Sequence, residues 1–450
     1  MVNQNVMRRG FCPGVWAPME SGDGLLVRAR ARRGRLQAEQ IRGLAHAARA
    51  FGNGIVELTR RANLQLRGVS PASLPDLQAE LVRLQLASAS LVEERRPVLW
   101  VCPLAGLDPR CPPLEPMAEA LESLLATPEL SGALSEKFLL LVSGGSGLFD
   151  ELELDVHVQL CPSRPDWARL SIADASGGAL ELGACRASDA ARAVQTLLVL
   201  LGATVPEHAR MRQLVAARGP SALRDALAPL LHPLPGAGAQ RPSVQSPAAA
   251  AEVLGFRAGV RSWFGLELPF GSLEAADWQL VAELAERFGS GEVRLLPGRA
   301  LLLPGVRESD GPELAQLATA RHFIVERPLP WLRLVACSGA PACRSAHAET
   351  RQLACDLADL VRTRLTGNAT LHVSGCEKGC AWGGAADITL VHGADGCRIG
   401  FGASVAETAR TAALGLDAIR ERLVRAAGPA RPPAAVAAPA AARVQEGPRS

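Results

Sequence analysis

The chain has 450 residues, of which 48% are hydrophobic and 21% are charged, and its formal net charge is +3. This length allows two to four globular domains, and the near balance of charge argues against a nucleic-acid partner. No apolar run predicts a signal peptide or a transmembrane helix, so we expect a cytoplasmic protein with no membrane partner. In a reducing compartment, its cysteines are expected to be metal ligands and buried thiols rather than disulfides.

Two alternating strands are predicted within a first half-domain at residues 10–95. The segment "GDGLLVRARARRGR" (22–35) places Arg28, Arg30 and Arg32 on one face. The segment "TRRANLQLRG" (59–68) places four polar side chains on one face, namely Arg61, Asn63, Gln65 and Arg67. A strand face with this many cations and amides is unfavourable to bury in a hydrophobic core. It suits the binding of a ligand with several carboxylates. A solvated sheet surface is the alternative, and Arg33 and Arg35 are expected to lie solvated in a turn.

A gapless internal repeat relates residues 33–69 to residues 270–306. It places Phe51 on Phe288, Gly52 on Gly289, Gly54 on Gly291 and Gly68 on Gly305. Both copies show the period of an amphipathic helix that ends at glycine, followed by a strand, a short turn and a second strand. Each copy therefore predicts a small α+β half-domain. The second copy keeps one cation on the equivalent strand pair, Arg299, which is a further candidate ligand contact.

A second, weaker sequence repeat follows each copy. In it, a strand, a loop and a helix lead to a strand that ends in Val-Ser-Gly. We therefore predict an internally duplicated α+β fold with two half-domains and two α/β domains. The first α/β domain is expected at residues 96–231, and a linker rich in Pro, Gly and Ala at residues 232–252. The second half-domain is expected at 253–330, the last α/β domain at 331–427 and a disordered tail at 428–450.

Four cysteines in the last α/β domain form the strongest motif of the chain. Cys337 and Cys343 are spaced C-x5-C in "ACSGAPACRSA", and Cys376 and Cys380 are spaced C-x3-C in "SGCEKGCAWGG". Both pairs follow a predicted strand, and the surrounding small residues let the backbone approach a bulky inorganic core. This pattern favours a [4Fe–4S] cluster, while a zinc site and buried free thiols remain alternatives.

Cysteines at the matching place in the first α/β domain, Cys102 and Cys111, are spaced x8. The strand that follows them ends in Gly144 and Gly145 rather than in cysteines. The first α/β domain is therefore expected to lack the cluster.

The duplication, the arginine-rich first copy and the paired cysteines together resemble the nitrite and sulfite reductase superfamily. This resemblance implies a reductase-like architecture in which two ferredoxin-like half-domains pair. It implies that Cys337, Cys343, Cys376 and Cys380 bind a [4Fe–4S] cluster, with Cys380 nearest any second metal centre. It also implies a substrate contact for Lys137. However, the Lys-x-Lys pair of the reductases is incomplete, because Leu139 stands at the second position.

The segments "GDGLLVR", "RANLQLRG", "PGRALLLPG" and "SGCEKGCA" resemble more closely the precorrin-3B synthase branch of this superfamily. That resemblance implies an O2-dependent monooxygenase of cobalamin biosynthesis, which hydroxylates precorrin-3A at C20 and forms a γ-lactone. It also implies a non-haem iron whose ligands are unknown, and an electron donor, either an NADH-linked reductase or a ferredoxin. Neither His347 nor His372, which lie near the cluster loops, is assigned as a ligand. The alternatives are a sirohaem sulfite or nitrite reductase and a non-catalytic tetrapyrrole- or zinc-binding protein.

Overall fold

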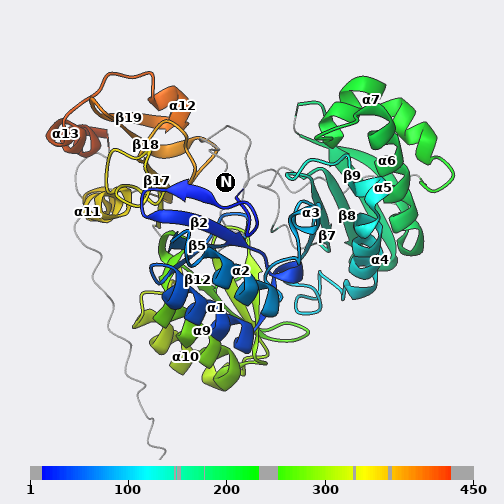
Figure 1. The fold of residues 1–450 in the computed structure, drawn as a ribbon, viewed down its shortest axis with the longest axis horizontal. Helices are drawn as coiled ribbons and strands as arrows, with labels where there is room; N and C mark the ends of the chain where they lie inside the picture. The colour runs from blue at the N-terminus through cyan, green and yellow to red at the C-terminus, as the bar shows by residue number, and fades with distance from the viewer. Residues whose placement is uncertain are drawn as a thin grey trace, which may run out of the picture. The chain divides into compact units, whose positions relative to one another are not determined.

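The computed structural model describes residues 13–145, 148, 154–176, 178–232, 252–327, 331–362 and 367–426 (Figure 1). The chain divides into two compact units, Met1–Arg327 and Pro328–Ser450. The first unit contains both half-domains and the first α/β sheet, and the second contains the four-cysteine motif. Most of the expected linker and the whole expected tail lie outside the described residues, so those two predictions stay untested.

The first half-domain forms a five-stranded sheet in the order β1-β2-β5-β4-β13. Its own strands are β1 (Met19–Ser21), β2 (Gly24–Ala29), β4 (Ile55–Leu58) and β5 (Leu64–Val69). The second half-domain repeats this arrangement in the order β11-β12-β15-β14-β3. Its own strands are β11 (Gly255–Arg257), β12 (Trp263–Glu267), β14 (Glu292–Leu296) and β15 (Ala300–Pro304).

The two half-domains exchange one short strand each. Strand β3 (Arg35–Gln37) belongs to the first copy but pairs antiparallel with β14, while β13 (Ser272–Glu274) belongs to the second copy but pairs with β4. The helices α1 (Ala38–Phe51) and α9 (Ala275–Phe288) pack against each other, and α2 (Leu74–Arg83) and α10 (Gly311–Thr319) complete the copies. One hydrophobic core runs through both half-domains, so the predicted pairing is confirmed.

The repeat extends to the backbone. Three non-glycine residues of the first copy adopt a left-handed conformation, and each has a left-handed counterpart in the same frame of the second copy. The pairs are Arg33 (φ 54) with Phe270 (φ 53), Ala62 (φ 46) with Arg299 (φ 73) and Gln85 (φ 57) with His322 (φ 63). Such conformations are rare away from glycine. Their recurrence in one frame therefore confirms the duplication independently of residue identity.

The first α/β domain is a five-stranded sheet in the order β10-β9-β8-β7-β6. Strands β6 (Val98–Val101), β7 (Leu139–Ser143) and β8 (Val156–Cys161) are parallel, while β9 (Arg164–Ala173) and β10 (Ala179–Arg186) are antiparallel. Its core is closed by α4 (Glu115–Ala126), α6 (Ala190–Thr204) and α7 (Met211–Leu227). The short helices are α3 (Leu91–Glu94) and α5 (Pro128–Ser131).

The second unit contains a four-stranded sheet in the order β16-β17-β18-β19. Strands β16 (Leu332–Ala336), β17 (Ala369–Ser374) and β18 (Ala386–Gly393) are parallel, and β19 (Gly396–Ala403) is antiparallel. Helix α11 (Thr350–Arg362) connects β16 to β17 and packs against both strands, as in a β-α-β crossover unit. Helices α12 (Val405–Thr408) and α13 (Leu416–Ala426) follow β19.

Candidate functional site

The two cysteine loops leave the same edge of the second unit's sheet. Cys337 comes directly after β16, and Cys376 comes two residues after the end of β17. Because β16 and β17 are parallel neighbours, their carboxyl ends meet at one edge, where loops commonly carry functional groups. The predicted strand–loop–helix–strand context of both cysteine pairs is therefore confirmed.

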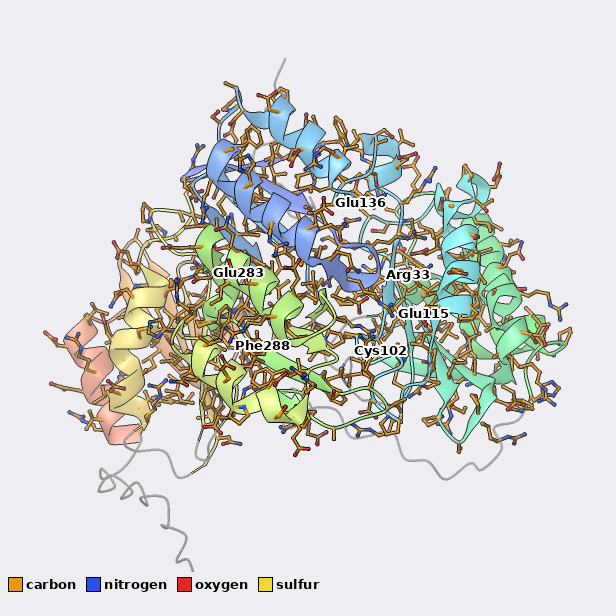
Figure 2. All side chains as sticks on the ribbon, turned by 90° about the horizontal axis from the view of Figure 1, so that it is seen from below. Arg33, Cys102, Glu115, Glu136, Glu283 and Phe288 are labelled. Carbon is orange, nitrogen blue, oxygen red and sulfur yellow. The ribbon has the colours of Figure 1, made fainter. Side chains whose placement is uncertain are left out.

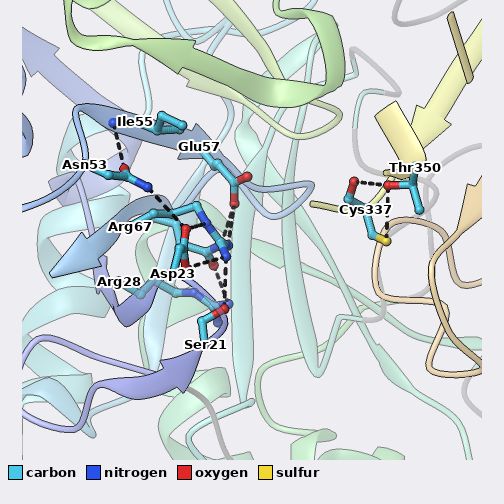
Figure 3. Close-up of polar contacts among 10 residues, drawn as sticks. Ser21, Asp23, Arg28, Asn53, Ile55, Glu57, Arg67, Cys337 and Thr350 are labelled. Atoms are coloured by element: carbon cyan, nitrogen blue, oxygen red, sulfur yellow. Dashed lines mark hydrogen bonds and ion pairs between the residues drawn. The ribbon is translucent and has the colours of Figure 1, made fainter. Parts of the chain in front are cut away.

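Backbone hydrogen bonds hold these two loops together. The His347 N–H donates to the Gly375 carbonyl oxygen (2.8 Å), and the Gly375 N–H donates to Cys337 Sγ (3.3 Å). The Thr350 hydroxyl, at the start of α11, donates to the Cys337 carbonyl oxygen (2.7 Å; Figure 3). A peptide N–H aimed at a cysteine sulfur is the kind of contact that stabilises a thiolate.

Two glycines allow the loops to come this close. A Cβ on Gly375 would lie 2.7 Å from Ala346 Cβ, in the loop that carries Cys343. A Cβ on Gly339 would lie 2.7 Å from the Thr350 nitrogen, and Gly339 also has φ +70°. Glycine is therefore required at these two positions for steric reasons, which the sequence alone does not reveal.

The four thiols are chemically suited to a shared inorganic core. All four are free and at least partly exposed. Burial raises the pKa of the Cys380 thiol, and the charges of Cys376, Cys337 and Cys343 raise it further. The other three thiolates thus each oppose ionisation of Cys380, and a cationic iron core would relieve this repulsion.

The number and type of the thiols can be compared with what each kind of metal site requires. Among the described residues, no group of three His, Cys, Asp or Glu side chains is placed to hold one metal ion. Zinc requires thiolates within about 2.3 Å of one atom, whereas the four thiolates of a cluster bind to four different irons. Four cysteines are the ligand set of a [4Fe–4S] cluster, so the residue types present fit one.

A second polar site lies on the sheet of the first half-domain. Arg28 Nη2 donates to Gln65 Oε1 (3.1 Å), and Gln65 Nε2 donates to Glu57 Oε2 (2.7 Å). Arg67 Nε and Nη2 grip the Asp23 carboxylate (2.9 and 3.0 Å), and its Nη1 approaches Glu57 (3.4 Å; Figure 3). Three members of the predicted polar face, Arg28, Gln65 and Arg67, thus lie together on the sheet, and the charge of Arg67 is balanced by carboxylates.

Other predicted contacts of the first half-domain have different environments. Strand β5 begins only at Leu64, so Arg61 and Asn63 lie in the turn before it, both half-buried. No hydrogen bond or ion pair of either side chain is found among the described residues, which leaves both able to meet a ligand. Arg30 donates to the Glu94 carbonyl oxygen (3.3 Å).

The turn that follows β2 corrects one expectation. Arg33 and Arg35 were both expected to lie solvated in a turn, but Arg35 begins β3, and Arg33 pairs with Glu122 on α4 through two hydrogen bonds (3.0 and 2.6 Å). Arg32 contacts the same carboxylate, and Arg35 pairs with Glu115 (2.6 Å). Arg33 and Glu115 are labelled in Figure 2. Through these ion pairs, the arginines connect the first half-domain to the first α/β domain.

Two further predicted residues lie in turns. Lys137 is half-buried in the turn before β7, and Leu139 begins that strand with only 5% of its surface exposed. Arg299 occupies the turn between β14 and β15. A ligand role for these residues stays a prediction.

Sequence reasoning missed the two acidic members of the polar face, Asp23 and Glu57. Glu57 lies on β4, surrounded by apolar residues in "GIVEL", and only 6% of its surface is exposed. A carboxylate inside an apolar strand was the available signal, since such a group is rarely buried without a cationic partner.

The fold and both sites define the class of this protein. The family model for the nitrite/sulfite reductase ferredoxin-like half domain matches residues 17–84 and 257–321, which are the two structural copies. The NirA protein of Mycobacterium tuberculosis has a similar fold, with a TM-score of 0.65 over 84% of this chain and 73% of that one, at 21% identity. This is the architecture of the nitrite and sulfite reductase superfamily.

A more specific relationship follows from whole-chain similarity. A precorrin-3B synthase from Sinorhizobium sp is 31% identical over 400 residues, covering 86% of this chain and 81% of the relative. The chloroplastic ferredoxin–nitrite reductase of Spinacia oleracea is 25% identical, covering 81% of this chain and 65% of the relative. The chain belongs to the precorrin-3B synthase family.

Proposed function

We propose that this chain is an oxidoreductase of cobalamin biosynthesis that forms precorrin-3B from precorrin-3A with O2. In the proposed reaction, C20 is hydroxylated and an acetate side chain closes a γ-lactone. Family membership supports this function, and the observation that carries it is the convergence of two paired-cysteine loops at one sheet edge. An enzyme of this class requires a tetrapyrrole site and a route for electrons.

The proposed ligands of a [4Fe–4S] cluster are Cys337, Cys343, Cys376 and Cys380. When bound, the cluster supplies one-electron transfer to the reaction. The Gly375 N–H would remain directed at the Cys337 thiolate, where it stabilises the negative charge. No side chain is assigned to the non-haem iron, and the electron donor is a reductase or a ferredoxin.

The polar face of the first half-domain is proposed to bind the carboxylate arms of the macrocycle. Arg28 and Arg61 are half-buried, so each can present N–H groups while keeping part of its surface away from competing water. Arg30, Asn63, Lys137 and Arg299 are further proposed contacts. Fixing several arms at once would hold the ring in one orientation, which lowers the entropic cost of reaction.

A sirohaem sulfite or nitrite reductase is the second candidate, supported by the spinach relative and the NirA-like fold. Leu139 argues against it, because a buried leucine at the second position of the Lys-x-Lys pair cannot hold a small anion or supply protons. A sirohaem absorption band together with turnover of sulfite or nitrite would favour this candidate instead.

The decisive experiment uses anaerobically purified protein, precorrin-3A, an electron donor and isotopically labelled dioxygen. We expect a product whose mass shows incorporation of labelled oxygen. Unchanged precorrin-3A in the presence of an intact, reducible cluster would exclude the proposed activity.

The cysteine assignment is tested by Cys376→Ser, with Cys355→Ser as the matched control because Cys355 is an exposed thiol on α11 outside the motif. We expect Cys376→Ser to lose most of its iron and sulfide and to form no product, while Cys355→Ser retains both. Product formation by Cys376→Ser at the wild-type rate would refute the assignment.

A further inference from the structure

The connection between β17 and β18 is an unusual crossover. The two strands are parallel neighbours, so residues 375–385, the crossover segment, must return from the carboxyl end of β17 to the amino end of β18 (Figure 1). Such a connection usually contains an α-helix that packs its apolar side on the sheet, as α11 does between β16 and β17. The crossover segment is described throughout, and it contains no helix. Another contact must therefore hold it against the sheet.

Trp382 is the one large apolar side chain of this segment, whose sequence is "GCEKGCAWGGA". The guanidinium carbon of Arg333 lies 4.8 Å from the centre of the Trp382 ring, which is the geometry of a cation–π contact. Arg333 belongs to β16, the edge strand of the sheet. The indole Nε1–H donates to the Ala385 carbonyl oxygen (3.1 Å), directly before β18 begins. Trp382 thus links the crossover segment both to β16 and to the start of β18.

Cys380 lies between two packed points of the crossover segment. On one side is Trp382, two residues away, so the two Cα atoms are at most about 7 Å apart. On the other side is Gly379, where an added Cβ would lie 3.2 Å from the Val405 side chain at the start of α12. Ala381, between Cys380 and Trp382, is only 3% exposed. The backbone on both sides of Cys380 is therefore packed, although Cys380 itself is exposed.

Cys380 depends on this packing more than Cys343 and Cys376 do. The Cys343 N–H donates to a backbone carbonyl oxygen (2.7 Å), and the Cys376 carbonyl oxygen accepts a hydrogen bond from the Ser374 hydroxyl (2.7 Å). No hydrogen bond of Cys380 is found among the residues that the structure describes. Its position is therefore set by its neighbours, of which Trp382 has the largest side chain.

We propose that Trp382 is a positioning residue for the proposed cluster, because it anchors the crossover segment and so fixes Cys380 before the cluster binds. Arg333 is its partner and holds the indole through the face of the ring. This inference rests on the proposed function, since it takes Cys380 as a cluster ligand. A ligand that is already ordered loses less conformational entropy on binding, which raises the affinity.

Trp382→Leu is the first test, made in protein that is purified anaerobically with its cluster. The variant keeps an apolar side chain but removes the ring on which Arg333 lies. We expect a chelator to remove iron about tenfold faster, as when one further backbone residue must be ordered in the bound state. We also expect a changed electron paramagnetic resonance spectrum of the reduced cluster, because the Cys380 thiolate is no longer held in one orientation.

Trp382→Phe provides the rescue, and Arg333→Met tests the partner. Phenylalanine keeps an aromatic face for the guanidinium, so Trp382→Phe should lose iron within about threefold of the wild-type rate. Arg333→Met should lose iron faster than wild type. The double variant Trp382→Leu/Arg333→Met should be no faster than Trp382→Leu alone, because both changes remove the same contact. Independent effects, which multiply in the double variant, would overturn the pairing.

Trp331→Leu is the matched control for stability. Trp331 is also a half-buried tryptophan of this unit, and it directly precedes β16, at the end of the strand opposite the cysteine loops. We expect it to lower Tm while the rate of iron loss and the spectrum stay as in wild type. If Trp382→Leu lowers Tm but leaves both unchanged, Trp382 only stabilises the fold and the inference fails. That result would leave the proposed function intact, whereas a wild-type protein without iron and sulfide would remove the proposed cluster itself.

Discussion

Gly375→Ala tests the close approach of the two cysteine loops. The backbone of Gly375 is not left-handed, so an added methyl group meets a steric obstacle rather than torsional strain. Its Cβ would lie 2.7 Å from Ala346 Cβ and 3.2 Å from Thr350 Cγ2. Relief requires the loops to separate, which moves the Gly375 N–H away from Cys337 Sγ. Such overpacking costs about 1–3 kcal/mol, or about a 5- to 150-fold loss in the affinity for the cluster.

The assay measures iron and sulfide per chain after purification, and the rate at which a chelator removes the iron. The matched control is Gly144→Ala in the first α/β domain, where a Cβ would lie 2.5 Å from the Arg110 carbonyl oxygen and 2.6 Å from Cys111 Cα. We expect the control to lower Tm but to keep full iron content. Equal iron retention and equal chelator resistance in Gly375→Ala and wild type would refute the reasoning.

Two further predictions concern stability. Burial lowers the pKa of His157 from 6.5 to about 4, so between these values the unfolded chain binds a proton that the folded chain excludes. Stability is therefore complete above about pH 6.5 and declines by up to about 3 kcal/mol toward pH 4. His157→Gln, which can keep the bond to Ser143 Oγ (2.7 Å), should show a smaller fall in Tm between pH 7 and pH 5 than wild type; an equal fall would contradict this. Glu122→Gln removes the negative charge that pairs with Arg32 and Arg33 and should lower the free energy of unfolding by about 2 kcal/mol. The measurement is a lower Tm with unchanged iron content. An unchanged Tm would show that water screens the ion pairs too strongly for them to stabilise the fold.

The duplicated fold was predictable because its signals are local. The helix period, the glycine stop and the two short strands recur in one frame, and each can be identified from a few consecutive residues. The structure places α1 and α9 at the positions that this frame requires. The cysteine loops were predictable for the same reason, since each pair directly follows a strand.

The exchange of β3 and β13 could not be read from the sequence. Each strand has only three residues, too few to show an alternating pattern, and its pairing depends on a partner more than 200 residues away, as in Leu36 with Val293. The same limit applies to Arg33. Its interaction with Glu122 is fixed by the packing of two domains, so the residue looked like part of a solvated turn.

The acidic partners of the arginines were the other feature that the sequence analysis did not predict. The arginines of the polar face were visible as an alternating row, but Asp23 and Glu57 are separated from them in sequence and appeared as ordinary acidic residues. Counting only the cations overestimates how many are available to a ligand. The structure shows that both carboxylates contact Arg67, so this arginine is less available to a ligand than its place in the sequence suggested.

Comparison of the two copies separates structural from functional residues. Positions that both copies share, such as the glycines after α1 and α9, maintain the fold in both. Two features occur in only one copy of their pair. Gln65 corresponds to Leu302 in the second half-domain, and the cysteine pair of Cys376 and Cys380 has no counterpart directly after β7. Under the proposed function, these differences assign substrate binding to the first half-domain and the cofactor to the last α/β domain. An exchange of Gln65 for the leucine of the second copy should therefore weaken tetrapyrrole binding without preventing the sheet from forming.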